Sequence, residues 1–195
     1  MEKFKGNRIE IETLEVAGFR SAFEALRLPK GRECRTESNF QMSVNGNCLG
    51  TITDVTLNEK DLHLASCLQK NSDCEAKVLR GIIAYAKITA PMYFFGELET
   101  YRHGHERLCS SSQQHIDFAR LSGEELEAAR DQVPAGYKYT KIDFFSYQCL
   151  RHIFQWRRNH RLPMWHTFCD WICHLPYANE LILVGLDTDG YPLEK

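Results

Sequence analysis

The 195-residue sequence lacks any apolar run long enough to cross a membrane. A membrane-spanning helix needs about 20 consecutive apolar residues, so no membrane association is expected. Residues 1–12 also lack the apolar stretch of a secretory signal. These absences predict a cytoplasmic protein. Its eight cysteines are then expected to be reduced thiols, because disulfides are rare in that compartment.

The sequence also has little excess of charge and lacks several familiar motifs. A net charge of −2 at pH 7 argues against a general nucleic-acid binder, so no nucleic-acid partner is expected. The phosphate-binding patterns GxGxxG and GxxxxGK[ST] are missing, which argues against a Rossmann or P-loop site. GxSxG is missing too, which disfavours an ordinary serine hydrolase.

Most of the sequence carries helix signals. Its length and its 43% hydrophobic content predict one domain, residues 1–195, with its own core. Alternation over residues 9–16 predicts a strand, whereas residues 30–50 read as loop. Helices are predicted over residues 21–28, 58–70, from a capping box at 72–75 to about 86, after a second capping box at 122–125, over 140–161, and from Pro163 onward.

The longest predicted helix, residues 140–161, carries two arginines one turn apart. With 3.6 residues per turn, Arg157 and Arg161 share a stripe with Ser146, whereas Gln148 and His152 lie about 160° away. Two such arginines either form a solvated face or bind an anion, since guanidinium groups match phosphate. Both interpretations stay open at this point.

The segment TYRHGHERLCSSSQQH, residues 100–115, is densely polar and follows an aromatic run. Arg102 and Arg107 are suited to bind phosphate, and Ser110, Ser111 and Ser112 are suited to donate hydrogen bonds. A solvated surface loop is the alternative. Polar groups of this density are costly to bury without partners, so a segment that lines a cleft is the functional hypothesis.

A second cluster, on the predicted C-terminal helix, raises the question of a metal. It consists of His166, Cys169, Asp170, Cys173 and His174. Its spacing does not match the usual paired-ligand zinc patterns. Cys169 also shares an apolar stripe with Trp165 and Phe168, which favours a buried thiol that packs as a small hydrophobe. No metal site is therefore predicted.

The polar segment resembles the signature of the flavin-dependent thymidylate synthases, which runs Arg-His-Arg, two residues, Ser, one residue, Asn-Glu, one residue, Ser, one residue, Arg. Arg102 and His103 stand at its first two positions, and Ser112 falls on the late Ser without a gap. The departures are Gly104 for the second Arg, Arg107 for the first Ser, Cys109 for the Asn, Ser110 for the Glu and Gln114 for the last Arg.

Two more regions extend the resemblance to about residues 14–185. The family's late helix has counterparts here in Ser146, Gln148, His152, Arg157, Arg161 and Trp165. IAYAKITAP, residues 83–91, resembles the apolar helix that leads into the signature. The chain as a whole looks like short, divergent relatives encoded by bacteriophages.

The resemblance implies an α+β fold, mainly helical, with a small antiparallel sheet. It implies methylation of dUMP to dTMP, with methylenetetrahydrofolate as carbon donor and with FAD, recharged by NADPH, as hydride donor. Family active sites lie between subunits of a homotetramer. A homotetramer is therefore expected, in the host cytoplasm if the chain is phage-encoded. An enzyme acting on another pyrimidine nucleotide, a non-catalytic nucleotide-binding protein of the same fold and a nucleic-acid binder using the basic helix are the alternatives.

The resemblance also assigns residues to roles. The expected nucleotide-binding residues are Arg102, Ser110, Ser111, Ser112, Gln114, Arg157 and Arg161. The expected FAD-binding residues are Arg102, His103, Cys109, Ser110, Ser146, Gln148 and His152. No cysteine nucleophile is expected, because the implied reaction proceeds by hydride transfer.

Overall fold

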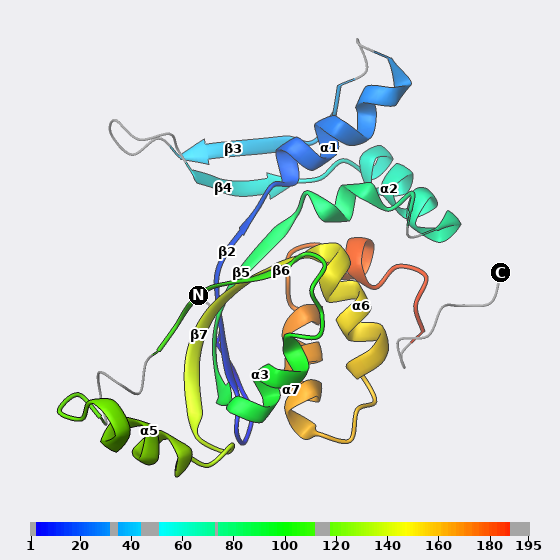
Figure 1. Cartoon of the computed structure of the whole chain (residues 1–195). Helices are drawn as coiled ribbons and strands as arrows, with labels where there is room; N and C mark the ends of the chain where they lie inside the picture. The colour runs from blue at the N-terminus through cyan, green and yellow to red at the C-terminus, as the bar shows by residue number, and fades with distance from the viewer. Residues whose placement is uncertain (1–2, 32–34, 44–50, 73, 112–117, 188–195) are drawn as a thin grey trace.

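The computed structural model describes residues 3–31, 35–43, 51–72, 74–111 and 118–187. A curved antiparallel sheet of five strands runs through the molecule in the order β1-β2-β5-β7-β6 (Figure 1). The strands are β1 (Lys3–Lys5), β2 (Glu10–Ala17), β5 (Ile83–Pro91), β6 (His105–Ser110) and β7 (Lys138–Ser146). Each pairs with its neighbours in antiparallel register, with Ile83 opposite Ser146 and His105 opposite Phe145.

One face of the sheet is covered by helices (Figure 1). These are α3 (Met92–Leu98), α6 (Tyr147–Arg157), α7 (Pro163–Cys173) and a π-helical turn (Ala178–Ile182). The core between the two layers contains many aromatic rings beside its aliphatic residues. Its ring contacts include those among Phe94, Phe145, Trp165, Phe168 and Trp171. Burial of such rings contributes most of the apolar stabilisation of a layer pair.

The remaining elements lie at the ends of the sheet (Figure 1). At one end are α1 (Phe19–Arg27), a 3₁₀ turn (Leu28–Lys30), the hairpin β3 (Asn39–Ser43) and β4 (Thr51–Thr56), α2 (Glu59–Asn71) and a 3₁₀ turn (Lys77–Arg80). Asp61 joins two of these elements: its carboxylate accepts 2.6 Å hydrogen bonds from Arg27 Nε and Ser38 Oγ. At the other end, α5 (Gly123–Asp131) projects from the sheet.

Several sequence predictions are confirmed. The strand at 9–16 is β2, and the helices at 21–28, at 58–70, after Ser122 and from Pro163 are α1, α2, α5 and α7. Asn58 caps α2 as expected, since its side chain accepts a 2.8 Å hydrogen bond from Lys60 N. The capping box predicted at 122–125 is wrong, because Ser122 precedes α5 without a side-chain hydrogen bond that caps the helix.

The helix predicted from the capping box at 72–75 is wrong. Ser72 Oγ does accept a 3.3 Å hydrogen bond from Glu75 N, but only a 3₁₀ turn follows, and residues 83–91 are strand β5. Ala84, Ala86, Ile88 and Ala90 are buried and alternate with more exposed residues. That period of two is typical of a strand. The likeness of IAYAKITAP to an apolar helix is wrong for the same reason.

The helix predicted over residues 140–161 is also partly wrong. Residues 138–146 form β7, which pairs with β5 on one side and β6 on the other, and α6 covers only Tyr147–Arg157. Arg161 therefore does not continue the stripe of Arg157. Further elements went unpredicted: the strands β1, β3, β4 and β6, of which β3 lies within the supposed loop 30–50, and the helix α3 in the aromatic run.

The α+β class, with helices beside an antiparallel sheet, is confirmed. Helices account for more of the described residues than strands do. In the part of the chain that the structure describes, no helix combines the length and the hydropathy that crossing a membrane requires.

Candidate functional site

A polar cavity of about 630 Å³ lies where the start of α6 meets the turn before β6. The size falls within the range of roughly 300–1,000 Å³ that small-molecule sites occupy. Its lining residues are Arg80, Ile83, Arg102, His103, Gly104, Ser146, Gln148 and His152. They come from three stretches that are far apart in the sequence: the end of the 3₁₀ turn with the start of β5, the segment 102–104, and the first turns of α6.

The antiparallel register explains why these stretches meet. Ile83, at the start of β5, pairs with Ser146 at the end of β7. Ser146 N donates a 2.6 Å hydrogen bond to the carbonyl of Gly104, which fixes the turn before β6 against the same point. Tyr147 N donates to the carbonyl of Ile82 at 2.9 Å. These bonds hold the three stretches side by side.

The cavity is basic. Two arginines and two histidines line it, and none of the described lining residues is a carboxylate. Within the described part of the chain, the side chains of Arg102 and His103 have no hydrogen bond or ion pair, and both are exposed. Guanidinium and imidazole N–H groups without protein partners suit an anionic ligand, above all phosphate.

The N-terminus of α6 adds to the positive electrostatic potential of the cavity. Ser146 is its N-cap, and the Ser146 side chain accepts a 3.2 Å hydrogen bond from Cys149 N. Helix N-termini carry a partial positive charge and favour anions. Gln148 and His152, one turn apart on this helix, extend the cavity wall along its first two turns. Side-chain donors and the helix end therefore favour the same sign of ligand charge.

Other predicted site residues lie elsewhere. Cys109 and Ser110 are exposed on β6, and Ser111 follows them. The Ser111 hydroxyl accepts a 3.0 Å hydrogen bond from Thr140 N, and Ser111 N donates to the carbonyl of Thr140 at 2.7 Å. The structure does not bring these three residues to the cavity. Ser112 and Gln114 lie outside the described residues.

Arg157 also lies apart from the cavity. Its Nη1 is 2.9 Å from Glu97 Oε2, its Nε donates to the Tyr101 hydroxyl at 2.9 Å, and its guanidinium lies 4.6 Å from the Trp165 ring centroid. Arg161 is exposed in the turn after α6. The predicted separation of Gln148 and His152 from Arg157 is confirmed: they occupy two faces of one helix.

Arg107 is not available to a ligand in the way the sequence suggested. Its guanidinium binds the buried carboxylate of Asp143 through Nε at 3.0 Å and Nη2 at 3.2 Å, and it also contacts Glu99. His105 Nε2 lies 3.1 Å from the same Asp143. Burial alone raises the pKa of Glu99, but the hydrogen bond and charge of Arg107 outweigh it, so this pKa is lowered. Arg107 thus neutralises the buried charge of Asp143, and His105 contacts the same carboxylate.

Solved structures that are similar to this one include two thymidylate synthases and a nucleotide methylase. A thymidylate synthase X (ThyX) from Helicobacter pylori with FAD and dUMP matches over 89% of this chain and 96% of its own, at TM-score 0.59 and 14% identity. A second H. pylori ThyX, complexed with FAD and dUMP, matches over 89% and 98%, at TM-score 0.60 and 12% identity. A UMP/dUMP methylase, PolB from Streptomyces cacaoi bound with 5-Br dUMP, matches over 90% and 94%, at TM-score 0.61 and 11% identity.

The chain has the ThyX fold. At identities of 11–14% the likeness concerns the fold alone, and the sequence itself matches no protein-family model and no curated relative. The resemblance that the degenerate signature suggested is thereby confirmed at the level of three-dimensional structure. The match covers most of this chain and nearly all of each of the three solved chains.

Within this ThyX fold, sequence reasoning missed one charged residue of the cavity. Arg80 closes a 3₁₀ turn, and its Nε donates a 2.8 Å hydrogen bond to Gln148 Oε1. The capping box before it predicted a helix that continues to about residue 86, whereas Arg80 lies at the end of a short turn beside α6. The usable signal was the tandem of Arg80 and Gly81 directly before an alternating apolar run, which is typical of a turn that enters a strand.

The buried thiols of Cys149 and Cys169 are poorly suited to act as nucleophiles. Burial raises the pKa of Cys149 to about 12 and that of Cys169 to about 12, so both stay protonated at neutral pH. The packing of Cys169 as a small hydrophobe is confirmed by its full burial. Among the described residues, no group of three or more His, Cys, Asp and Glu side chains is arranged to hold a metal ion.

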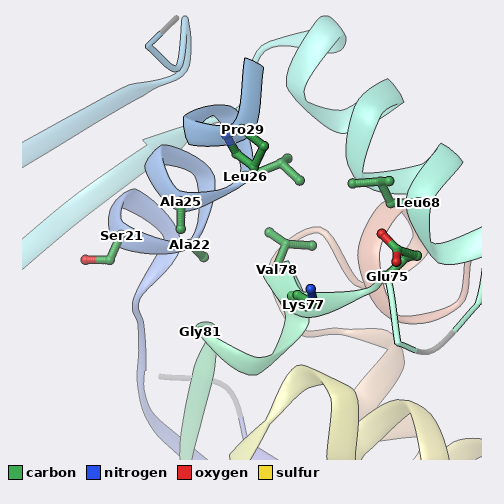
Figure 2. Close-up of a pocket in the computed structure, with 10 residues that line it drawn as sticks. All are labelled: Ser21, Ala22, Ala25, Leu26, Pro29, Leu68, Glu75, Lys77, Val78 and Gly81. Carbon is green, nitrogen blue, oxygen red and sulfur yellow. The ribbon is translucent and has the colours of Figure 1, made fainter. Parts of the chain in front are cut away.

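A second cavity, of about 350 Å³, lies between α1, α2 and the 3₁₀ turn Lys77–Arg80. Figure 2 shows Leu26, Leu68 and Val78 pointing toward one another across it. Its charged lining residues are Glu75 and Lys77, of opposite sign. This mostly apolar space lacks the set of phosphate donors that the first cavity gathers.

Proposed function

We propose that the chain is an enzyme that methylates dUMP to dTMP, with FAD as hydride carrier and with methylenetetrahydrofolate and NADPH as co-substrates. One observation carries this proposal. Five residues assigned to FAD by the resemblance, Arg102, His103, Ser146, Gln148 and His152, line a single basic cavity in a chain with the ThyX fold. The solved H. pylori proteins of that fold hold FAD and dUMP.

The donors of the cavity fit a flavin dinucleotide. FAD carries two phosphate groups, and the cavity offers exposed guanidinium and imidazole groups beside a helix N-terminus. Arg102 and His103 would bind phosphate or sugar oxygens, and Gln148 and His152 would orient the bound cofactor along α6. When bound, reduced FAD supplies the hydride that completes the methyl group. The residues of the chain bind and orient the reactants, which is how such sites accelerate reactions.

The nucleotide is proposed to bind at a site shared between copies of the chain. Arg157 faces Glu97 and Tyr101, on the opposite side of α6 from the cavity. In one copy the two faces of this helix cannot reach one ligand. In a homotetramer, Arg157 and Arg161 of one copy and Ser110, Ser111, Ser112 and Gln114 of another would bind the dUMP phosphate and ring. Cys109 would lie at the edge of that shared site.

The purified protein is therefore expected to be a homotetramer. Light scattering coupled to size exclusion at micromolar concentration measures this directly. The expected mass is four times 22.6 kDa. A strict monomer across that concentration range would contradict the shared site.

Replacing Arg157 with alanine is expected to weaken dUMP binding at least about ten-fold, because a charge-assisted hydrogen bond to phosphate contributes about 1.5 kcal/mol or more. Arg158→Ala is the matched control. Arg158 is the next residue, and it pairs with Asp170 at 2.7 Å just as Arg157 pairs with Glu97. Isothermal titration with dUMP compares the two. Equal losses in both variants would indicate a diffuse basic surface instead of a phosphate site.

A second candidate function is methylation of a different pyrimidine nucleotide. It is favoured by the loss of charged signature residues at positions 104, 110 and 114 and by the likeness in fold to a UMP/dUMP methylase. Assays of the purified protein with FAD, NADPH and methylenetetrahydrofolate separate the two by product. dTMP formation supports the first proposal. FAD binding with turnover of UMP and not of dUMP supports the second, whereas FAD-free binding of nucleotide indicates a non-catalytic protein.

Bacteriophage origin and cytoplasmic location stay predictions.

A further inference from the structure

Arg80 lines the basic cavity, and neighbouring hydrogen bonds hold its backbone in place. The 3₁₀ turn that carries it is anchored by the buried side chains of Val78 and Leu79, and Gly81 N closes the turn on the carbonyl of Val78 at 3.2 Å. The next residue, Ile82, accepts a hydrogen bond from Tyr147 N at the start of α6. The backbone of Arg80 is thus held beside the first turn of that helix.

The Arg80 guanidinium is only partly engaged. Its Nε donates to Gln148 Oε1 at 2.8 Å. The described residues supply it with no other hydrogen bond or ion pair, and the residue is exposed. Both Nη groups are therefore available, on a guanidinium whose orientation Gln148 already fixes. A preoriented arginine fork of this kind suits two oxygens of one phosphate group.

At position 104 the chain lacks an arginine that the family signature contains, so the cavity has one cation fewer. The family signature has an arginine there, but this chain has Gly104 with a φ of 80°. A Cβ on Gly104 would collide with Ser146 Oγ, the N-cap of α6. The close approach of the turn to Ser146 therefore leaves no room for a side chain, and one cation is missing from the cavity wall.

We propose that Arg80 supplies the missing cation and binds the diphosphate of the flavin dinucleotide, with Gln148 as the residue that orients it. This inference rests on the proposed use of FAD and adds a binding residue outside the signature and the late helix. Arg80 and Arg102 would then neutralise the two phosphate charges from two walls of the same cavity. The positive charge of the phosphate site would then come from the turn Lys77–Arg80 instead of from position 104.

FAD titrations of wild type, Arg80→Ala, Arg80→Lys and Lys77→Ala test this proposal. Lys77 is the matched control, since it is an exposed cation of the same turn but lines the other cavity. Arg80→Ala is expected to raise the Kd for FAD by about ten-fold, because one charge-assisted contact is lost. The inhibition constant of inorganic pyrophosphate, measured in competition with FAD binding, should rise by about the same factor. Arg80→Lys should recover part of both, because it retains the charge. Lys77→Ala should match wild type.

The outcomes separate this inference from the proposed function. Wild-type affinity for FAD and pyrophosphate in Arg80→Ala overturns the role of Arg80 and leaves the flavin site standing. Equal losses in Lys77→Ala and Arg80→Ala also overturn it, because they indicate general charge attraction. An absence of FAD binding by the wild type overturns the flavin site itself.

Discussion

Replacing Gly104 with alanine is expected to lower the free energy of unfolding by about 2–3 kcal/mol. The φ of 80° places this residue in the left-handed region, where a side chain costs about 1–2 kcal/mol. The new Cβ would also displace the Ser146 hydroxyl that caps α6, and loss of an N-cap costs about 1 kcal/mol. Urea unfolding followed by circular dichroism measures the sum.

Gly123→Ala is the control for the backbone contribution. Gly123 has a φ of 55°, and a Cβ there would meet nothing within 4 Å. The control should therefore lose only the left-handed cost, about 1–2 kcal/mol. The difference between the two variants reports the contact between position 104 and Ser146. Identical losses would show that this contact does not constrain the cavity.

Removing the Arg102 side chain is expected to weaken FAD binding by about ten- to a hundred-fold. Arg102 lines the cavity and has no ion-pair partner among the described residues, so its truncation removes a ligand contact without breaking a protein one. A charge-assisted hydrogen bond contributes about 1.5–3 kcal/mol, which gives that range of affinity. Fluorescence titration with FAD measures the change.

The Cys109→Ala variant tests whether FAD binding depends on the cavity alone or also on the rest of the polar segment, residues 100–115. Cys109 is exposed on β6 and does not line the cavity. Near-wild-type FAD affinity and activity are therefore expected in Cys109→Ala, although the signature places an FAD contact at this position. Loss of activity with FAD binding intact would mean that the thiol takes part in the reaction and that hydride transfer alone does not describe it.

Sequence periodicity predicted elements well where one face alone is buried. Glu10–Ala17 and Glu59–Asn71 lie at the edges of the core, and their patterns gave the right element. β5 and β7 carry small or charged residues at buried positions, such as Ala84, Ala86 and Asp143, and these residues obscure the alternation in the sequence. Lys141 and Asp143 of β7 are buried and form ion pairs with Glu99 and Arg107, and no local pattern predicts such long-range partners.

The candidate site was predictable where residues stay local in the chain. Arg102 and His103 follow from the resemblance to the family signature, and Gln148 and His152 follow from the resemblance to the family's late helix. Arg80 became visible only once the strand pairing had placed its turn beside α6. Conversely, Arg107 seemed suited to bind phosphate because the sequence does not reveal that Asp143 lies across the sheet from it.

Titration of the wild-type protein with FAD is the measurement that tests the basic cavity most directly. Trp156 follows His152 by one helical turn on α6 and is 75% exposed, so its emission is expected to report a flavin bound beside it. A flavin site predicts saturable quenching, with one FAD per chain and a Kd of about ten micromolar or lower, a free energy near −7 kcal/mol. The absence of saturable quenching up to about a hundred micromolar FAD would contradict it.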